Sequence, residues 1–357
     1  MKETPLAKRI RRLIEAAGPI SVADYMAHCL GDPEHGYYMT RDPFGEGGDF
    51  VTAPEISQMF GEIVGAWMVH AWQADGAPSP VRLVELGPGR GTLMADILRV
   101  SAQRPDFLRS VTVDLVETSP VLRARQAETL ASAAPAIQWH NSFAHVPEGP
   151  LLLVANEFFD ALPTRQFVRI EGAWRERVVG LDGDTLVFGI GPARLDAGPP
   201  APEGAILEMR PAADALTAEI AARIVENGGA GLVIDYGHLA SGPGDTLQAV
   251  AGHAFADPLD APGEADLTAH VDFAALARRA RAEGAAVHGP ITQGDFLMRL
   301  GLLERAGQLG ARAGEETRDA LRLAAERLAG PEAMGSLFKV MAITRPGVAV
   351  PPFTDGV

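Results

Sequence analysis

Three glycines at alternate positions form the clearest chemical signature in this chain of 357 residues. Gly87, Gly89 and Gly91 directly follow the apolar run 81–86 and precede residues with helical spacing. Glycine lets a backbone turn sharply and approach a ligand closely, and free N–H groups at the start of the next helix favour anionic atoms. The spacing predicts a nucleotide-like cofactor at this turn, and the alternative is a tight turn that serves packing alone.

Two further positions indicate which cofactor fits. A dinucleotide fingerprint places glycine at the first, third and sixth positions of the turn, but the sixth position here is Thr92. Glu117 ends the next apolar run, where its carboxylate can accept hydrogen bonds from both hydroxyls of a ribose. This combination favours S-adenosylmethionine, and a nicotinamide cofactor is the alternative.

The elements that must position these residues alternate along the chain. Short apolar runs at 81–86, 111–116, 137–139, 151–155 and 231–235 are separated by stretches with helical spacing or by loops. Such alternation predicts an α/β fold, with a mostly parallel sheet and helices on both faces. Two later runs, at 285–288 and 336–343, bring the expected total to seven strands.

The segments around these runs define the predicted domains. Residues 1–80 show helical spacing and loops, which predicts an N-terminal helical cap and lid. Residues 165–229 begin with three runs typical of antiparallel strands, which predicts an insertion that shapes a substrate cleft. Residues 81–164 and 230–345 then form the Rossmann-like cofactor domain, with a long loop expected after Asp235.

Composition excludes several classes of protein. Hydrophobic residues make up 47% and charged residues 22%, as in ordinary globular proteins, so intrinsic disorder is excluded. No apolar stretch reaches the roughly 20 residues of a membrane span, and no signal-peptide core follows Met1. These features predict a cytoplasmic protein without membrane insertion. The net charge of −15 argues against a nucleic-acid partner.

Metal and redox chemistry are not expected. Cys29 is the only cysteine, so neither an internal disulfide nor a zinc ribbon can form. His238, His253, His270 and Asp272 match no zinc-binding spacing. We therefore predict no metal site, and the sequence leaves the oligomeric state open.

Several blocks spread from about residue 6 to residue 343 resemble the MidA-like family of class I S-adenosylmethionine-dependent methyltransferases. The blocks are 18–26, 36–38, 48–57, 84–91, 156–163, 235–238 and 265–273. This family includes the mitochondrial complex I assembly factor that methylates arginine. The resemblance implies a class I methyltransferase fold, S-adenosyl-L-methionine as cofactor, and a protein substrate such as a subunit of respiratory complex I (NADH dehydrogenase).

An arginine acceptor needs acidic partners, because a guanidinium is charged and must lose a proton when it is methylated. Glu157 and Asp160 lie just after the run 151–155, at the edge where parallel α/β sheets bind ligands, and can clamp the guanidinium. The phenylalanines between them can stack on it; in the alternative, the acids start a helix and the phenylalanines are core. Asn156 can instead bind the cofactor, and His238 is a second candidate proton acceptor.

Two loops are expected to complete the cofactor site. Asp49, Thr52, Pro54 and Glu55 can close over the methionine end of the cofactor, although Thr52 and Glu55 also fit a helix cap with its capping carboxylate. A second loop follows the run 137–139, where class I methyltransferases usually contact adenine. The predicted cofactor-binding residues are Glu85, Gly87, Pro88, Gly89, Gly91, Glu117, Asn141, Ser142, Asn156, Thr52 and Pro54, and the predicted catalytic residues are Glu157, Asp160 and His238.

Two rival functions come from other classes. A nicotinamide-dependent oxidoreductase is disfavoured by Thr92 in place of the third glycine of the dinucleotide fingerprint. An assembly chaperone that keeps the cofactor pocket only as a structural element is disfavoured by Glu157 and Asp160. The sequence therefore predicts an S-adenosylmethionine-dependent methyltransferase that acts on protein arginine.

Overall fold

The computed structural model describes residues 3–43, 45, 51–133 and 135–353. Its chain divides into two compact units. Unit 1 comprises Met1–Phe50, Asp160–Ala215 and Ala240–His270, and unit 2 comprises Val51–Phe159, Leu216–Leu239 and Val271–Val357.

The central element of unit 2 is an eight-stranded sheet with the order β15-β16-β10-β5-β2-β3-β4, in which β14 also pairs with β10. Its strands are β2 (Val81–Leu86), β3 (Val111–Val116), β4 (Ile137–His140), β5 (Leu151–Asn156), β10 (Gly229–His238), β14 (Val271–Asp272), β15 (Ala286–Thr292) and β16 (Phe338–Thr344). Strand β16 runs antiparallel to β10 and β15, and the other pairs are parallel. The predicted α/β class is confirmed; β14 adds an eighth strand because two residues are too few to show a periodic pattern.

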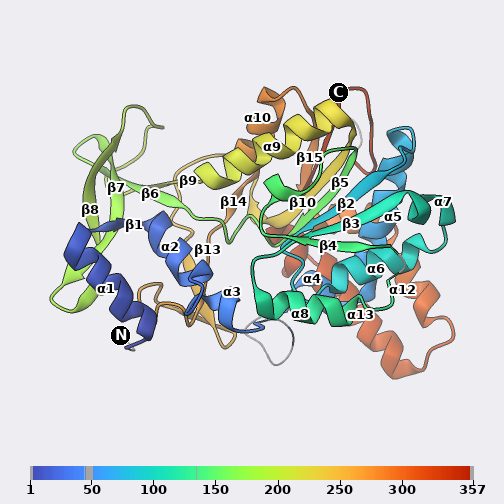
Figure 1. The fold of residues 1–357 in the computed structure, drawn as a ribbon, viewed down its shortest axis with the longest axis horizontal. Helices are drawn as coiled ribbons and strands as arrows, with labels where there is room; N and C mark the ends of the chain where they lie inside the picture. Colours follow the sequence, from blue (N-terminus) through green and yellow to red (C-terminus); the bar gives the residue numbers. More distant parts are fainter. Residues whose placement is uncertain (1–2, 44, 46–50, 134, 354–357) are drawn as a thin grey trace. The chain divides into compact units, whose positions relative to one another are not determined.

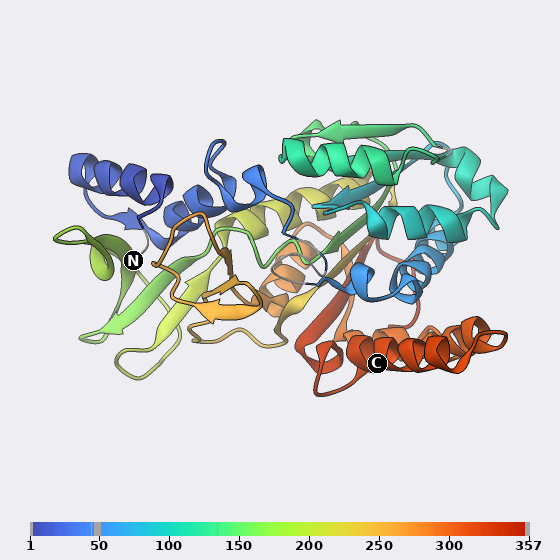
Figure 2. The same ribbon diagram turned by 90° about the horizontal axis from the view of Figure 1, so that it is seen from below.

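Helices cover both faces of this sheet (Figures 1 and 2). In Figure 1, α9 (Pro211–Asn227) and α10 (Phe273–Ala282) lie on one face, and α5 (Gln58–Ala74) and α6 (Thr92–Ser101) lie on the other. A Cβ added to Gly65 would lie 2.9 Å from the Cα of Ile97, so glycine lets α5 approach α6 closely. This packing places α5, which was expected in the N-terminal cap, in unit 2.

The remaining helices of unit 2 are short or C-terminal. They are α4 (Ala53–Ile56), α7 (Pro105–Ser110), α8 (Pro120–Thr129), α11 (Gln293–Arg299), α12 (Leu302–Gly310), α13 (Glu315–Ala329) and α14 (Met334–Leu337). Because helices cover both faces, the inner strands are mostly apolar, and every residue of β5 and β16 is buried. Parallel strands bring their C-terminal ends to one edge, and that edge carries the candidate site.

Unit 1 combines helices with two antiparallel sheets. Its helices are α1 (Pro5–Ala17), α2 (Val22–Gly31) and α3 (Tyr37–Thr40). The larger sheet has the order β1-β7-β6-β9 with β8 on β7, and its strands are β1 (Ile20–Ser21), β6 (Arg165–Ile170), β7 (Ala173–Asp182), β8 (Thr185–Leu195) and β9 (Ile206–Met209). The three antiparallel strands expected in the insertion therefore form as β6, β7 and β8.

The segment 240–270 differs from the long loop that was expected there. It contains the small sheet β12-β11-β13, formed by β11 (Gln248–Ala251), β12 (Ala254–Ala256) and β13 (Asp266–Thr268). These strands are short, and every residue of β12 is exposed, so no alternation of apolar and polar residues marks them in the sequence. The segment belongs to unit 1 rather than to the unit that carries the glycine turn.

Candidate functional site

The glycine turn connects the end of β2 to the start of α6. Gly87, Gly89 and Gly91 have φ angles of +60°, +53° and +82°, a left-handed backbone that other residues rarely adopt. The N–H of Gly91 donates to the carbonyl oxygen of Pro88 at 2.7 Å, which closes the turn. No side chain among the described residues caps α6, so its first N–H groups face the turn without a protein acceptor from a cap. This geometry suits an anionic group of a ligand.

Gln126 connects this turn to the predicted ribose-binding acid. Its Nε2 donates to the carbonyl oxygen of Gly89 at 2.8 Å and to Oε2 of Glu117 at 3.1 Å. Trp139 Nε1 donates to Gln126 Oε1 at 2.9 Å and thereby fixes which side of the amide is the donor. Burial raises the pKa of Glu117, while hydrogen bonds from Ser119 and Gln126 act in the opposite direction. Sequence reasoning missed Gln126, because a glutamine on a helix carries no pattern that marks it as buried.

Two buried polar atoms at adjacent strand ends have no hydrogen-bond partner among the described residues. They are Oε2 of Glu85, on β2, and Oδ1 of Asn156, at the end of β5. Burial raises the pKa of Glu85 to about 8. A buried acceptor without a partner is costly, and a cationic or hydrogen-donating ligand would satisfy both atoms. The ammonium and sulfonium charges of S-adenosylmethionine meet this requirement, so the residues present fit this cofactor.

Helix α4 is attached to the glycine turn through Glu55. Glu55 Oε1 accepts a hydrogen bond from Thr92 Oγ1 at 2.5 Å, and Glu55 Oε2 lies 3.9 Å from Nη1 of Arg90. Thr52 is buried before α4, and its side chain makes no capping bond to the described residues of that helix. The alternative of a helix cap with its capping carboxylate therefore does not form. Pro54 lies in the first turn of α4, and Asp49 falls outside the described residues.

Glu157 lies directly after β5 in an unusual backbone conformation. Its φ is +52°, in the left-handed region. Its Oε1 accepts hydrogen bonds from the N–H of Ala53 at 3.0 Å and from Asn156 Nδ2 at 3.1 Å. The main chain on either side is bonded to β10: Glu157 N–H donates to Ile234 O at 2.9 Å, and Phe159 N–H donates to Asp235 Oδ2 at 2.9 Å. The carboxylate of Glu157 is thus held at the edge of the sheet, close to α4.

Asp160 and His238 are the two other predicted catalytic residues. Asp160 is buried and belongs to unit 1, where its carbonyl oxygen accepts from the N–H of Ala269 at 3.1 Å. His238 ends β10 in unit 2, and its Nε2 lies 3.9 Å from Oδ2 of Asp272. The structure thus places Glu157 and His238 in one unit and Asp160 in the other.

The predicted adenine loop follows β4. Nη2 of Arg123 donates to Oδ1 of Asn141 at 2.7 Å, and Nε of Arg123 donates to the carbonyl oxygen of Glu117 at 2.8 Å. Ser142 Oγ lies 3.1 Å from Nδ1 of His145. Arg123 therefore connects the loop after β4 to the end of β3, beside Glu117.

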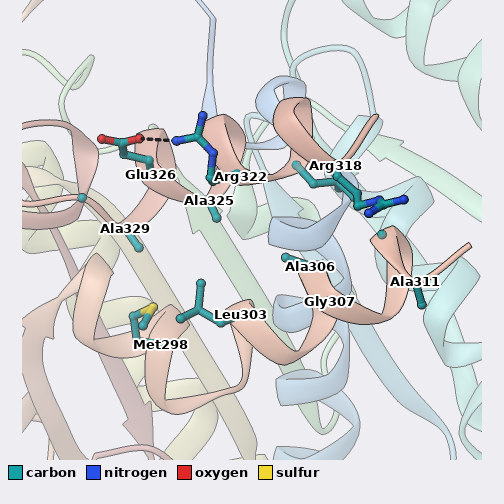
Figure 3. Close-up of a pocket in the computed structure, with 13 residues that line it drawn as sticks. Met298, Leu303, Ala306, Gly307, Ala311, Arg318, Arg322, Ala325, Glu326 and Ala329 are labelled. Carbon is teal, nitrogen blue, oxygen red and sulfur yellow. Dashed lines mark ion pairs between the residues drawn. The ribbon is translucent and has the colours of Figure 1, made fainter. Parts of the chain in front are cut away.

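One pocket of unit 2 is lined by none of these residues. It has a volume of about 720 Å³ and lies among α11, α12 and α13, where Met298, Leu303 and Ala325 are part of its lining (Figure 3). In the described part of the chain, no helix is long and apolar enough to cross a bilayer. No group of three or more His, Cys, Asp or Glu residues in that part is arranged to hold a metal ion.

Comparisons with known proteins identify the family of this chain. A model of a family described as S-adenosyl-L-methionine-dependent methyltransferases matches residues 63–291. The mitochondrial protein arginine methyltransferase NDUFAF7 of Mus musculus is 39% identical over 375 residues, which cover 95% of this chain and 84% of that protein. The Drosophila melanogaster homolog of that protein is 39% identical over 380 residues, which cover 96% of this chain and 85% of the homolog. A crystal structure of a Burkholderia thailandensis protein bound to S-adenosyl-homocysteine has a TM-score of 0.84 at 31% identity, and the match covers 98% of this chain and 96% of that protein.

These comparisons also correct one expectation. The NDUFAF7 relatives are named as mitochondrial proteins, so the prediction of a cytoplasmic location is wrong. That prediction used the lack of an apolar core after Met1, which bears only on secretion. The predicted cofactor and enzyme class are confirmed: this chain belongs to the S-adenosyl-L-methionine-dependent methyltransferase family, as a relative of NDUFAF7.

Proposed function

We propose that this chain transfers a methyl group from S-adenosylmethionine to an arginine side chain of a protein. The names of the relatives support this substrate, because protein arginine methyltransferases align with 95% or more of the chain. The observation that carries the proposal in the structure is the carboxylate of Glu157, held at the strand edge by Ala53 and Asn156. A fixed carboxylate at this edge suits a cationic acceptor.

Glu157 has two tasks in this proposal. Its carboxylate binds the protonated guanidinium and orients one nitrogen toward the methyl group, since in-line displacement requires alignment of the reacting atoms. When bound, the cofactor supplies an electrophilic methyl group on a sulfonium. Glu157 then accepts the proton that the nitrogen loses as the new nitrogen–carbon bond forms and the carbon–sulfur bond breaks. Asp160 is proposed as a second carboxylate for the guanidinium, and His238 as the alternative proton acceptor.

Phe158 is proposed to shield the reaction from water. A Cβ added to Gly87 would lie 2.7 Å from Cδ2 of Phe158, so the ring packs directly against the glycine turn. Phe158 and Phe159 also form an edge-to-face pair with ring centroids 5.8 Å apart. An aromatic ring in this position can stack on a guanidinium and exclude water from the methyl group.

The remaining predicted residues are proposed to bind the cofactor. Glu117 binds the ribose hydroxyls, and Glu85 binds the cationic methionine end in this proposal. Asn141 and Ser142 are assigned to the adenine, and Thr52 and Pro54 to the methionine end. Residues 165–229 are proposed to take part in substrate recognition, and a respiratory complex I subunit is the proposed class of substrate, with its assembly as the process supported.

The experiment that tests this proposal locates the transferred methyl group. The purified protein is incubated with S-adenosylmethionine carrying a tritiated methyl group and with the protein fraction of an extract from its own host. Acid hydrolysis should then release the label as methylarginine. Label on another amino acid would exclude arginine as the acceptor, and bound cofactor without any transfer would favour the assembly chaperone.

A further inference from the structure

Asp235 is a fully buried carboxylate that the proposed chemistry does not use. It lies on β10, next to Ile234, which pairs in register with Asn156 of β5. Its Oδ2 accepts hydrogen bonds from the N–H groups of Phe158, at 3.2 Å, and Phe159, at 2.9 Å. Its Oδ1 accepts from the N–H of Tyr236 at 2.9 Å. A carboxylate of β10 therefore binds the backbone of the loop that follows β5.

The position of these bonds is significant because the preceding residue is strained. Glu157 has a φ of +52° and is not glycine, a conformation that persists only where the surrounding structure imposes it. On its N-terminal side, β5 is fixed in the sheet through its pairing with β10. On its C-terminal side, the described bonds to the loop backbone at Phe158 and Phe159 come from Asp235. Asp235 thus holds one of the two ends between which Glu157 is constrained.

We infer that Asp235 is a positioning residue for methyl transfer, acting through Glu157. By holding the backbone of Phe158 and Phe159, it keeps the carboxylate of Glu157 where Ala53 and Asn156 bind it. Hydrogen bonds that backbone N–H groups donate to a buried carboxylate are strong enough to maintain such a conformation. This inference rests on the proposed function, in which Glu157 binds the guanidinium and accepts its proton.

A double-mutant cycle between Asp235→Asn and Glu157→Gln tests the inference. The asparagine offers one acceptor oxygen in place of two, so the loop loses part of its anchoring. The readout is the rate of methylarginine formation at saturating S-adenosylmethionine, with the protein fraction of a host extract as acceptor. Asp235→Asn should lower this rate about tenfold or more in the wild-type background and should change it less than about twofold in the Glu157→Gln background. The affinity for S-adenosylmethionine should stay within about threefold of wild type in both.

Asp114→Asn is the matched control for loss of a buried carboxylate. Asp114 is fully buried on β3 and pairs with Arg82 at 3.3 Å and His140 at 2.7 Å, on the neighbouring strands β2 and β4. Asp114→Asn should lower the melting temperature and leave the rate of methylarginine formation near that of the wild type. If Asp235→Asn does not fold, Asp235→Glu is used in the same cycle, because it keeps both oxygens and displaces them by one methylene.

The outcomes separate the inference from the proposed function. Equal losses of rate for Asp235→Asn in both backgrounds, or a wild-type rate in the folded single variant, would overturn the positioning role. A wild-type rate for Glu157→Gln alone would instead overturn the role of Glu157 on which the inference rests, and the absence of methylarginine with the wild-type protein would overturn the proposed function. A loss that disappears in the Glu157→Gln background supports the positioning role, since a general loss of stability would lower both rates alike.

Discussion

Two buried glutamates of unit 2 have opposite electrostatic environments. Glu62, on α5, binds Arg305 through bonds of 2.6 and 2.9 Å and also binds Arg99. Burial opposes its ionisation, but the two arginines outweigh burial and lower its pKa. Glu85, at the sheet edge, has an oxygen without a partner among the described residues, and burial raises its pKa to about 8.

The difference shows how this fold divides structural from ligand-binding charges. A buried carboxylate that is paired with two arginines connects the helices that carry them, and its charge is already neutralised by protein groups rather than by a ligand. A buried acid without a protein cation costs stability, and this cost is recovered when a cationic ligand binds. Glu62 connects α5, α6 and α12, whereas Glu85 lies beside the glycine turn. Variants at the two positions should therefore affect different properties of the enzyme.

The largest expected effect comes from blocking the edge at which Glu85 lies. Gly89→Val places a β-branched side chain at a φ of +53° on the turn, where a ligand must approach the backbone. We expect the affinity for S-adenosylmethionine to fall by about a hundredfold or more, measured by titration calorimetry. The control is Gly172→Val, at a φ of +74° with no atom within 4 Å of an added Cβ, which imposes similar backbone strain in unit 1. Wild-type affinity in folded Gly89→Val would remove the turn from the cofactor site.

A smaller loss of affinity is expected at the ribose acid. Glu117→Ala should weaken S-adenosylmethionine and S-adenosylhomocysteine by the same factor, about tenfold to a hundredfold, because ribose contacts do not change during transfer. Gln126→Leu removes the donor shared by Glu117 and Gly89, and it should weaken both ligands by a few fold. A variant that weakens only one of the two ligands would place that residue near the reacting sulfur instead.

Glu117 could be predicted from the sequence as a site residue, whereas Gln126 could not. The strands, the glycine turn and Glu117 are predictable from neighbouring residues. Continuous apolar runs indicate the strands, spaced glycines indicate the turn, and Glu117 is an acid at the end of a run. Gln126 and Asp235 act on segments 37 and 76 residues away, at Gly89 and Phe159, so their contacts arise only after the sheet and helices assemble. The same reason explains Glu55, whose spacing fits a local cap but whose carboxylate binds Thr92 instead.

The direct comparison of the two glutamates uses Glu62→Gln and Glu85→Gln. Glu62→Gln removes the anion that Arg305 and Arg99 share, leaves Arg99 paired with Asp96, and should lower the free energy of unfolding by about 1–3 kcal/mol, with unchanged cofactor affinity. Glu85→Gln should keep or increase the stability of the free protein and should weaken S-adenosylmethionine. Thermal melting and calorimetry on both variants provide the test. If both variants lose stability equally and bind cofactor equally, the proposed division between the two acids does not hold.

The smallest expected effect is a pH dependence that comes from Glu85. The pKa of Glu85 is about 8 in the folded protein and ordinarily 4.5. Between pH 4.5 and about 8, Glu85 is therefore protonated in the folded state and ionised in the unfolded state. The contribution of Glu85 to stability is therefore fully present below about pH 4.5 and falls as pH rises through about 8. Affinity for the cationic cofactor should rise over the upper part of this window. Glu85→Gln should flatten both profiles relative to wild type, and identical profiles would assign the pH dependence to other groups.

The central claim concerns Glu157, and one measurement tests it most directly. Glu157→Gln nearly keeps the shape of the side chain and deletes its charge, so cofactor binding and chemistry can be separated on one sample. We predict a wild-type dissociation constant for S-adenosylmethionine together with a fall of about a hundredfold or more in methylarginine formation. A variant that binds the cofactor and forms methylarginine at the wild-type rate would contradict the account and direct attention to His238.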